Sequence, residues 1–311
     1  MSSTHFSGYA AILGRPNAGK STLMNTLLGS KLSIATHKAQ TTRHQIMGIY
    51  SEQDYQIIFL DTPGIIQPKY ELQKAMMRFV KKAEREADVM LLLVDLKRSY
   101  VQQDQDKKNV LNAPPELVDQ ELLRHIRSQN KPVILVLNKM DAVSEEWSIK
   151  VQEAYEKVFT FTGIQAISAL EKNGIPALIN QLKANLPKGP AFYPKDELSE
   201  HPLRFFVSEF IREQLFLNYH EELPYSATIE ILEYKESPDI DRIMADVVVN
   251  RNSQKGIIIG KKGAAIKQLG IQSRARIESF LGKQIHLELH VKVRERWREK
   301  EQTVRNLGYR E

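Results

Sequence analysis

The chain has 311 residues, of which 42% are hydrophobic and 26% are charged, and it contains no cysteine. This length favours two domains, and the composition is ordinary for a globular protein. The absence of cysteine excludes disulfide bonds and thiolate metal sites. No segment has the pattern of a signal peptide or of a membrane span, so we expect a cytoplasmic protein.

The net charge of +6 is distributed unevenly along the chain. Residues 251–311 contain 15 Lys and Arg against 6 Asp and Glu, so the preceding 250 residues carry a net charge of −3. A basic C-terminal region on a slightly acidic body predicts a polyanionic partner, whereas the simpler interpretation is a charged face that aids solubility. The same charge permits peripheral contact with anionic lipid of the inner membrane. We expect the chain to act as a monomer.

Residues 1–185 alternate apolar runs with amphipathic stretches, which is typical of an α/β domain with a mostly parallel sheet and helices on both faces. We expect strands at residues 9–14, 55–61, 89–95, 132–138 and 164–168. We expect helices to begin after residue 20 and near residues 72, 115, 146 and 174. The longer strands end in Gly, Asp or Asn, at the edge of the sheet where ligands of such domains bind.

The remaining segments differ in pattern from these alternating strands and helices. Residues 97–119 are polar and lack clear periodicity, and we interpret them as a surface insertion before a helix. Residues 186–202 hold four prolines and a glycine, which is typical of a linker. Residues 203–294 predict an α+β domain with the order helix, strand, strand, helix, helix, strand, and residues 295–311 form a basic tail.

The sequence GRPNAGKS at residues 14–21 matches the phosphate-binding pattern G-x-x-x-x-G-K-[ST] between an apolar strand and a helix. Its glycines let backbone N–H groups close around a phosphate, and the start of the helix adds positive potential. We expect Lys20 to contact the β- and γ-phosphates and the Ser21 hydroxyl to ligate Mg²⁺. The residues of this loop expected to contact the nucleotide are Gly14, Asn17, Ala18, Gly19, Lys20, Ser21 and Thr22.

The sequence NKMD at residues 138–141 follows a strand and predicts selection of guanine over adenine. The Asp141 carboxylate can accept two N–H bonds from the Watson–Crick edge of guanine, whereas adenine would leave this charge unpaired. Asn138 can hold the N7 side of the base and bond back to the phosphate loop, and the stem of Lys139 can cover the ring. Ser168 and Ala169 would complete the base pocket through the Ala169 backbone N–H.

The sequence DTPG at residues 61–64 comes at the end of another apolar strand. We expect Asp61 to hold Mg²⁺ through water and the Gly64 N–H to contact the γ-phosphate, so that this loop senses whether the phosphate is present. The expected nucleotide contacts in this loop are Asp61, Thr62, Pro63 and Gly64.

Residues 38–48 lie between the phosphate loop and DTPG, and this loop would close over the metal ion. We favour Thr42 over Thr41 as the ligand from this loop. The candidate metal ligands are therefore Ser21, Thr42 and Asp61, and the candidate catalytic residues are Lys20, Thr42 and Gly64.

The sequence GIIIGKKG at residues 256–263 departs from the spacing of a phosphate loop, so we expect no second nucleotide site. It contains G-x-x-G between two helical segments, which in this element order is typical of a type II KH domain that clamps single-stranded RNA. The glycines let the sugar-phosphate backbone approach, the lysines face phosphates, and the isoleucines either form a floor for bases or belong to the core. The candidate RNA-binding residues are Ile257, Ile258, Ile259, Gly260, Lys261, Lys262, Gly263 and Lys267.

Four further residues have two interpretations each. Arg274, Arg276 and Lys283 either extend this basic surface or are ordinary surface charges. Trp297, which lies among arginines, either stacks on a base or packs inside the protein.

The segments GRPNAGKSTLMN, KAQTTRH, DTPG and NKMD, together with the KH pattern, resemble the Era family of bacterial GTPases along nearly the whole chain. The resemblance implies a GTPase that uses Mg²⁺, binds the 3′ region of 16S rRNA and acts in assembly of the 30S subunit. It also implies that two switch loops, residues 38–48 and 61–70, reorganise when the γ-phosphate leaves. The insertion at residues 97–119 is longer than is usual in the family.

Ile65 and Ile66 follow Gly64, whereas Ras-like enzymes carry a glutamine two residues after this glycine that positions the attacking water. Neither isoleucine can hydrogen-bond water, so the intrinsic hydrolysis should be slow, and the family shares this apolar replacement. In related GTPases an Asn at the position of Asn17 helps to hold K⁺ beside the phosphates. We therefore expect hydrolysis to be faster in K⁺ than in Na⁺.

Two other functions are compatible with the same residues. The chain could be a constitutive RNA-binding protein that holds GTP only as a structural ligand, in which case Lys20→Ala would change no multiple-turnover phosphate release. It could also be a GTPase of tRNA modification or of membranes that uses its KH fold to dock a protein. RNA crosslinking that survives Gly260→Asp and Gly263→Asp would favour this second alternative.

Overall fold

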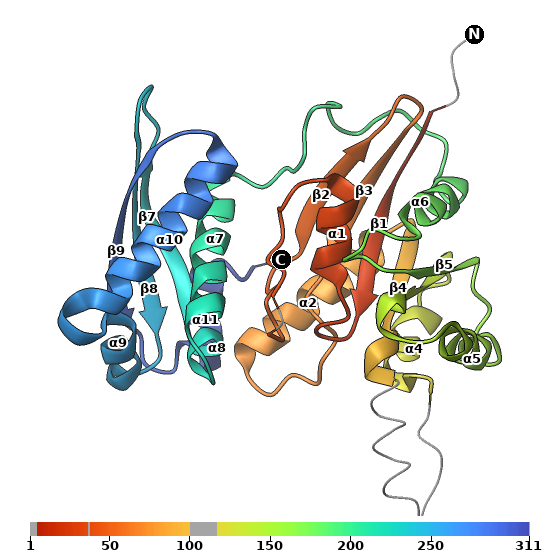
Figure 1. Cartoon of the computed structure of the whole chain (residues 1–311), viewed down its shortest axis with the longest axis horizontal. Helices are drawn as coiled ribbons and strands as arrows, with labels where there is room; N and C mark the ends of the chain where they lie inside the picture. Colours follow the sequence, from red (N-terminus) through yellow and green to blue (C-terminus); the bar gives the residue numbers. More distant parts are fainter. Residues whose placement is uncertain (1–4, 37, 100–116, 311) are drawn as a thin grey trace, which may run out of the picture. The chain divides into compact units, whose positions relative to one another are not determined.

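The computed structural model describes residues 5–36, 38–99 and 117–310 (Figure 1). The described residues divide into two compact units. The first draws on the ranges 1–35, 42–67 and 77–200, and the second draws on the ranges 36–41, 68–76 and 201–311.

The first unit is built on a six-stranded sheet in the order β2-β3-β1-β4-β5-β6. Every neighbouring pair is parallel except β2 and β3, so the expected mostly parallel sheet is confirmed. The strands are β1 (Phe6–Gly14), β2 (Ile46–Ser51), β3 (Tyr55–Asp61), β4 (Val89–Asp95), β5 (Val133–Asn138) and β6 (Gly163–Ile167).

The expectation of a loop over residues 38–48 is wrong at its C-terminal end, because β2 begins at Ile46. This strand pairs antiparallel with β3, and its Ile46 and Ile49 side chains are buried. Gly48 lies where a Cβ would come within 2.4 Å of the Leu28 side chain, so the strand packs closely against a helix. A short strand interrupted by glycine gives little alternation in the sequence, which is why it was not predicted.

Helices cover both faces of this sheet, as the doubly buried strands require. They are α1 (Lys20–Leu28), α2 (Glu71–Glu86), α4 (Gln120–Arg127), α5 (Glu145–Glu156) and α6 (Ile175–Ala184). Buried side chains of α2, α4 and α5 form one core with alternate residues of β1, β3, β4 and β5, while α1 packs on β1, β2 and β3, and α6 on β6. The helix expected near residue 115 is α4, and its predicted start lies outside the described residues.

The register of the parallel strands brings their carboxyl ends to one edge of the sheet. Ile12 of β1 pairs with Asp61 of β3, Asp95 of β4 pairs with Asn138 of β5, and Asn138 pairs with Ile167 of β6. The polar residues that end these strands therefore lie side by side, and this edge carries the nucleotide motifs.

The segment interpreted as a linker is bound to the first unit along most of its length. Its backbone pairs with the start of β1 through Lys188 and Gly189, and the Phe192 ring stacks on Tyr9 at 5.5 Å. Further along, the Leu198 carbonyl accepts a hydrogen bond from the Ile49 N–H of β2 at 2.9 Å. Prolines and glycine here shape an ordered path over the sheet edge instead of a free connection.

The second unit contains a three-stranded sheet in the order β7-β8-β9, in which β7 is antiparallel and β9 is parallel to β8. The helices α7 and α10 pack on each other, with α7 against β7 and α10 against β9. The predicted order of elements is confirmed, with a short extra helix before β7. The elements are α7 (Leu203–Asn218), α8 (Leu223–Ser226), β7 (Thr228–Lys235), β8 (Asp241–Val249), α9 (Asn252–Ile259), α10 (Ala264–Leu281), β9 (Ile285–Val293) and α11 (Glu301–Asn306).

The C-terminal segment is part of the core of this second unit. Trp297 is 0% exposed and its indole Nε1–H donates to the Ser226 carbonyl at 2.9 Å. Tyr309 is also buried, and its ring stacks on Trp297 while its hydroxyl bonds to Thr228 at 3.0 Å. The interpretation of Trp297 as a base-stacking residue is therefore wrong, because its ring is enclosed by protein.

Candidate functional site

The phosphate loop ends where α1 begins, and its geometry depends on Gly19. This residue has φ 98°, and an added Cβ would lie 2.2 Å from the Asn138 amide nitrogen, so only glycine fits. Lys20 follows as the first helical residue and is 6% exposed. Its ammonium donates to the carbonyls of Gly14 at 3.3 Å and Arg15 at 2.9 Å, which holds the cation over the loop.

Burial of this lysine changes its ionisation. Burial lowers the pKa of Lys20 to about 8, while the Asp61 carboxylate acts in the opposite direction. Burial also raises the pKa of Asp61, against the effects of Lys20 and of the Ser21, Ser33 and Thr42 hydroxyls. A cation and a carboxylate buried together in this way suit a site whose ligand supplies both negative phosphate and a metal ion.

The three candidate metal ligands converge at the end of β3. The Ser21 hydroxyl donates to Asp61 Oδ2 at 2.8 Å, and its oxygen lies 2.8 Å from Thr42 Oγ1. Thr42 is buried and lies 3.5 Å from the same carboxylate oxygen, whereas its neighbour Thr41 is only half-buried. The preference for Thr42 over Thr41 thus agrees with the direction of the side chain.

These residues fit a magnesium ion that is shared with phosphates. Asp61 Oδ1 is buried and has no hydrogen-bond partner within the described residues, so one hard oxygen is left for a cation. Over the same ranges there is no cluster of three or more His, Cys, Asp and Glu that could hold a metal ion. One carboxylate with two hydroxyls is the protein contribution expected when phosphate and water complete an octahedral Mg²⁺ site.

The base side of the site is organised by Asn138, which is 2% exposed. Its amide nitrogen donates to the Ala18 carbonyl at 2.8 Å, as predicted for a tie to the phosphate loop. Its amide oxygen accepts the Ala169 backbone N–H at 3.0 Å. The sequence interpretation assigned that N–H to the base and so missed the partner that it has in the structure.

Lys139 and Asp141 flank the position of the base. The Lys139 ammonium donates to the Asn17 carbonyl at 2.8 Å and to Asp95 at 2.6 Å, so its stem extends from the end of β5 across to the phosphate loop. Asp141 is exposed, with its carboxylate available to a ligand from solvent. Asp95 was not predicted to have a role, although its position at the end of β4 was the signal that could have identified it.

Other predicted nucleotide contacts serve the loops themselves. The Thr62 hydroxyl donates to the Ile12 carbonyl at 2.7 Å and is fully buried, so its side chain fastens β3 to β1 and is not directed at a ligand. Ser168 is also fully buried, and its hydroxyl accepts the Glu171 N–H at 3.1 Å. Pro63 and Gly64 are buried directly after β3, and Thr22 is half-buried on the first turn of α1.

The G-x-x-G loop of the second unit is the other predicted site. Gly260 has φ 70°, and an added Cβ would lie 2.6 Å from the Ala265 Cβ, so the loop closes tightly onto the start of α10. Lys261, Lys262 and Lys267 are all exposed. The loop therefore presents glycine backbone and ammonium groups together, as a phosphate-binding surface requires.

The three isoleucines before this loop separate into different environments. Ile258 is 0% exposed, so its assignment to RNA binding is wrong and it belongs to the core. Ile257 is 56% exposed and Ile259 is half-buried. Only these two can contribute apolar surface beside the glycines, because successive residues of a short helix point in different directions.

Two of the extra basic residues are occupied by neighbours within the second unit. Arg276 pairs with Glu213 at 3.1 Å and lies 3.9 Å over the Phe210 ring. Lys283 pairs with Asp241 at 2.5 Å. They therefore stabilise the helix and sheet packing and do not extend the basic surface.

Among the described helices, none has both the length and the hydropathy needed to cross a membrane.

Comparison with known proteins agrees with this combination of sites. Residues 9–139 match a protein-family model described as a 50S ribosome-binding GTPase, and residues 222–298 match the KH domain. The chain is 42% identical over 313 residues to the chloroplastic GTPase ERA1 of Zea mays, covering 99% of this chain and 72% of the maize protein. It is 41% identical over 306 residues to the GTPase Era of Staphylococcus haemolyticus, covering 98% and 97% of the two chains.

Two solved structures resemble the whole chain. One is Era of Aquifex aeolicus, a variant bound to GDP and AlF₄⁻, with a TM-score of 0.87 and 36% identity, covering 98% of this chain and 99% of that one. The other is Era in complex with MgGDPNP and nucleotides 1506–1542 of 16S ribosomal RNA, with the same TM-score, identity and coverage.

Proposed function

This chain belongs to the Era family of GTPases, and we propose that it uses GTP hydrolysis to control its binding to the 3′ region of 16S rRNA during assembly of the 30S subunit. It is a GTPase that binds GTP and GDP with Mg²⁺. The observation that carries the proposal is the presence, in one chain, of a phosphate loop with buried Lys20 and Asp61 and of a G-x-x-G loop with exposed lysine side chains.

The residues of the first unit have distinct tasks in GTP hydrolysis. Lys20 holds a positive charge where the β- and γ-phosphates lie, and it stabilises the negative charge on the transferring group. Gly64 offers its N–H to the γ-phosphate, and Asp141 accepts the N–H groups that distinguish guanine. Ser21, Thr42 and Asp61 would hold Mg²⁺, which would neutralise part of the negative charge of the phosphates.

The two residues that follow Gly64 offer the attacking water no polar side chain. Ile65 is 0% exposed and Ile66 is half-buried, so these two positions contribute backbone groups only. Slow intrinsic hydrolysis follows from this arrangement, because little orients the nucleophile. We also propose that K⁺ held beside Asn17, which has a left-handed backbone with φ 65°, accelerates the reaction. Equal single-turnover rates in K⁺ and Na⁺ buffers would contradict this role.

RNA binding is proposed for the loop from Gly260 to Gly263. Gly260 and Gly263 both have a positive φ, of 70° and 79°, which strains any side chain, although Asp tolerates this region better than most residues. Gly263 is the better position for a test, because its added Cβ would meet nothing within 4 Å, whereas Gly260→Asp would also press on Ala265. A carboxylate at residue 263 would repel phosphate without displacing a neighbour. Leu232→Asp is the matched control, since Leu232 is 47% exposed on β7 and gains the same charge away from this loop.

The experiment is a fluorescence titration of a single-stranded oligoribonucleotide with the sequence of the 16S rRNA 3′ end. We expect Gly263→Asp to weaken binding about tenfold or more and Leu232→Asp to leave it nearly unchanged. Equal affinities for the wild type and Gly263→Asp would contradict RNA binding by this loop and would favour a KH fold used for docking a protein.

Phosphate release that persists in Lys20→Ala would contradict the catalytic assignment of Lys20.

The cellular setting is a separate proposal. We propose that the chain acts as a cytoplasmic monomer, with peripheral contact between its basic C-terminal region and anionic lipid. The net charge of residues 251–311 supports this contact. Flotation with vesicles that contain anionic lipid, against neutral vesicles, tests the contact, and light scattering after gel filtration tests the monomer.

A further inference from the structure

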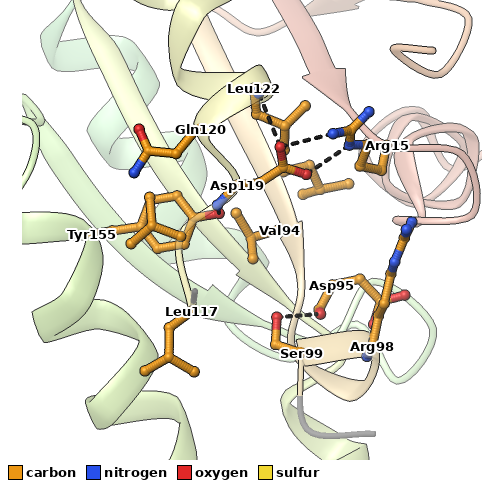
Figure 2. A pocket seen from close by; sticks show the side chains of 12 residues that line it. Arg15, Val94, Asp95, Arg98, Ser99, Leu117, Asp119, Gln120, Leu122 and Tyr155 are labelled. Atoms are coloured by element: carbon orange, nitrogen blue, oxygen red, sulfur yellow. Dashed lines mark hydrogen bonds and ion pairs between the residues drawn. The ribbon is translucent and has the colours of Figure 1, made fainter. Parts of the chain in front are cut away.

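The side chain of Arg15, the second residue of the phosphate loop, reaches the start of α4. Its Nε donates to Asp119 Oδ2 at 2.6 Å and its Nη2 donates to Asp119 Oδ1 at 2.9 Å, so the two groups form a bidentate pair (Figure 2). Glu121 adds a second carboxylate 2.7 Å from Nη2. Such a fork fixes the direction of the guanidinium as well as its position.

The remaining edge of the same guanidinium reaches the loop that follows β3. Arg15 Nη1 donates to the Ile65 carbonyl at 3.3 Å, and the Ile65 N–H donates to the Gly14 carbonyl at 3.0 Å. Both backbone groups of Ile65 are therefore bonded to residues 14 and 15 of the phosphate loop. Gly64, whose N–H is expected to contact the γ-phosphate, immediately precedes Ile65, which makes these two hydrogen bonds.

Asp119 is itself held rigidly. Its carboxylate caps α4 by accepting the N–H groups of Glu121 and Leu122 at 3.1 Å, and its own N–H donates to the Tyr155 hydroxyl at 3.1 Å. Tyr155 is 1% exposed within the core of the unit. The guanidinium of Arg15 thus lies between a fixed helix start and the mobile element expected in a GTPase, the loop after Gly64.

We propose that Arg15 is a positioning residue for GTP hydrolysis, which holds the Gly64–Ile65 segment against the phosphate loop and takes its own orientation from Asp119 at the start of α4. This inference rests on the GTPase activity and not on the RNA partner. Arg15 touches no reacting atom in this role. It positions the Gly64 N–H by bonding the next residue.

Removal of the guanidinium should therefore lower the rate of hydrolysis more than it lowers nucleotide affinity. GDP binding depends on the phosphate loop backbone and the groups that hold the base, whereas the Arg15 side chain bonds Asp119, Glu121 and the Ile65 carbonyl. Arg15→Ala should reduce the single-turnover rate constant about tenfold and change the Kd for GDP by no more than about twofold. Arg15→Lys keeps the charge without the planar fork, so it should restore little of the rate.

Asp119→Asn is the second variant, because Asn also caps helices but loses the charged bidentate pair. If Asp119 acts through Arg15, the double variant Arg15→Ala/Asp119→Asn should hydrolyse GTP no more slowly than Arg15→Ala alone. Arg98→Ala is the matched control. Arg98 is exposed and lines the same cavity of about 280 Å³, but its guanidinium has no bond to the loop after β3 among the described contacts.

The measurements are single-turnover hydrolysis, GDP affinity and thermal unfolding of each variant. A tenfold loss of rate in Arg15→Ala, with near-normal GDP affinity and no additional loss in the double variant, is the expected result. An unchanged rate, an equal loss of rate and GDP affinity, or losses that multiply in the double variant would each overturn the proposal. If Arg15→Ala does not fold, the rate of Asp119→Asn decides alone, because an unchanged rate there also overturns it.

Discussion

The nucleotide loops of the first unit and the G-x-x-G loop of the second both combine glycines with lysines, yet they differ in burial. Lys20 and Asp61 are 6% and 0% exposed, whereas Lys261 and Lys262 are exposed. Burying a charged group costs free energy unless the ligand supplies a partner of opposite charge, so the first site accepts only ligands that supply such partners. Exposed lysines attract any nearby polyanion, so the second site gains affinity from charge and loses it in salt.

The largest effect expected is on the folding of one unit alone. Trp297→Ala removes a fully buried ring from the second unit and should lower its free energy of unfolding by about 3–5 kcal/mol. The chain has two tryptophans, and the other, Trp147, lies in the core of the first unit. In this variant Trp147 fluorescence reports the first unit, and its transition should be unchanged while circular dichroism shows the second unit unfolding earlier. A parallel shift of both transitions would show that the units do not unfold separately.

The next effect tests the buried cation directly. Lys20→Ala should lower the rate of GTP hydrolysis by about 10²–10³-fold, because a preorganised charge at the transferring phosphate is lost. Lys82→Ala, on the exposed face of α2, is the control and should retain the wild-type rate. RNA affinity of the nucleotide-free protein should be the same in both variants. A Lys20→Ala protein with near-normal turnover would contradict the assignment of the phosphate loop.

RNA binding by the exposed G-x-x-G loop should weaken with salt more than nucleotide binding by the buried site around Lys20. Lys261→Ala/Lys262→Ala should reduce the slope of log affinity for single-stranded RNA against log salt by about 1.4, or about 0.7 for each lost phosphate contact. Lys235→Ala/Arg242→Ala removes the same charge from the sheet of the same unit and should leave the slope nearly unchanged. Equal slopes for these two variants would show that general charge, and not the loop, attracts RNA.

The smallest effect concerns the pH dependence of the Arg15–Asp119 pair. Burial opposes ionisation of Asp119, but the hydrogen bonds from Arg15, Leu122 and Glu121 hold its pKa below the ordinary value. A carboxylate with a lowered pKa stabilises the fold above its unfolded pKa of about 3.9, and this stabilisation is lost as pH falls through the folded value. Asp119→Asn should therefore be less stable than the wild type by about 1 kcal/mol at pH 6, and this difference should narrow as the pH falls below about 3.9. Denaturant titrations across this range measure the difference, and a gap that is constant with pH would contradict an ionic origin.

The features that the sequence predicts well are those carried by local spacing. The phosphate loop, DTPG and NKMD each follow a strand, so a parallel sheet brings them to one edge whatever the rest of the chain does. The proximity of Ser21 and Asp61 follows from this topology, whereas Thr42 reaches them from the loop before β2. The sequence favours Thr42 over Thr41, and in the structure Thr42 is the one of the two whose side chain is buried.

The features that were missed depend on contacts between distant residues. The Arg15–Asp119 pair joins positions 104 residues apart, and the Lys139–Asp95 pair joins two strand ends, so neither leaves a local pattern. Ile258 could not be separated from Ile257 because the phase of an eight-residue helix is set by packing. The basic neighbours of Trp297 suggested a surface position, whereas tertiary contacts with Ser226 and Tyr309 bury it.

The central claim is that the state of the nucleotide in the first unit sets the RNA affinity of the second. Its most direct test is the Kd for the 16S rRNA 3′-end oligoribonucleotide, measured by calorimetry with the chain saturated in turn by MgGDPNP and by MgGDP. We predict that RNA binds about fivefold or more tightly in the MgGDPNP state than in the MgGDP state. By linkage, RNA should raise the affinity for GDPNP relative to that for GDP by the same factor. Equal RNA affinities in the two states would contradict the claim and leave an RNA-binding GTPase whose two sites act independently.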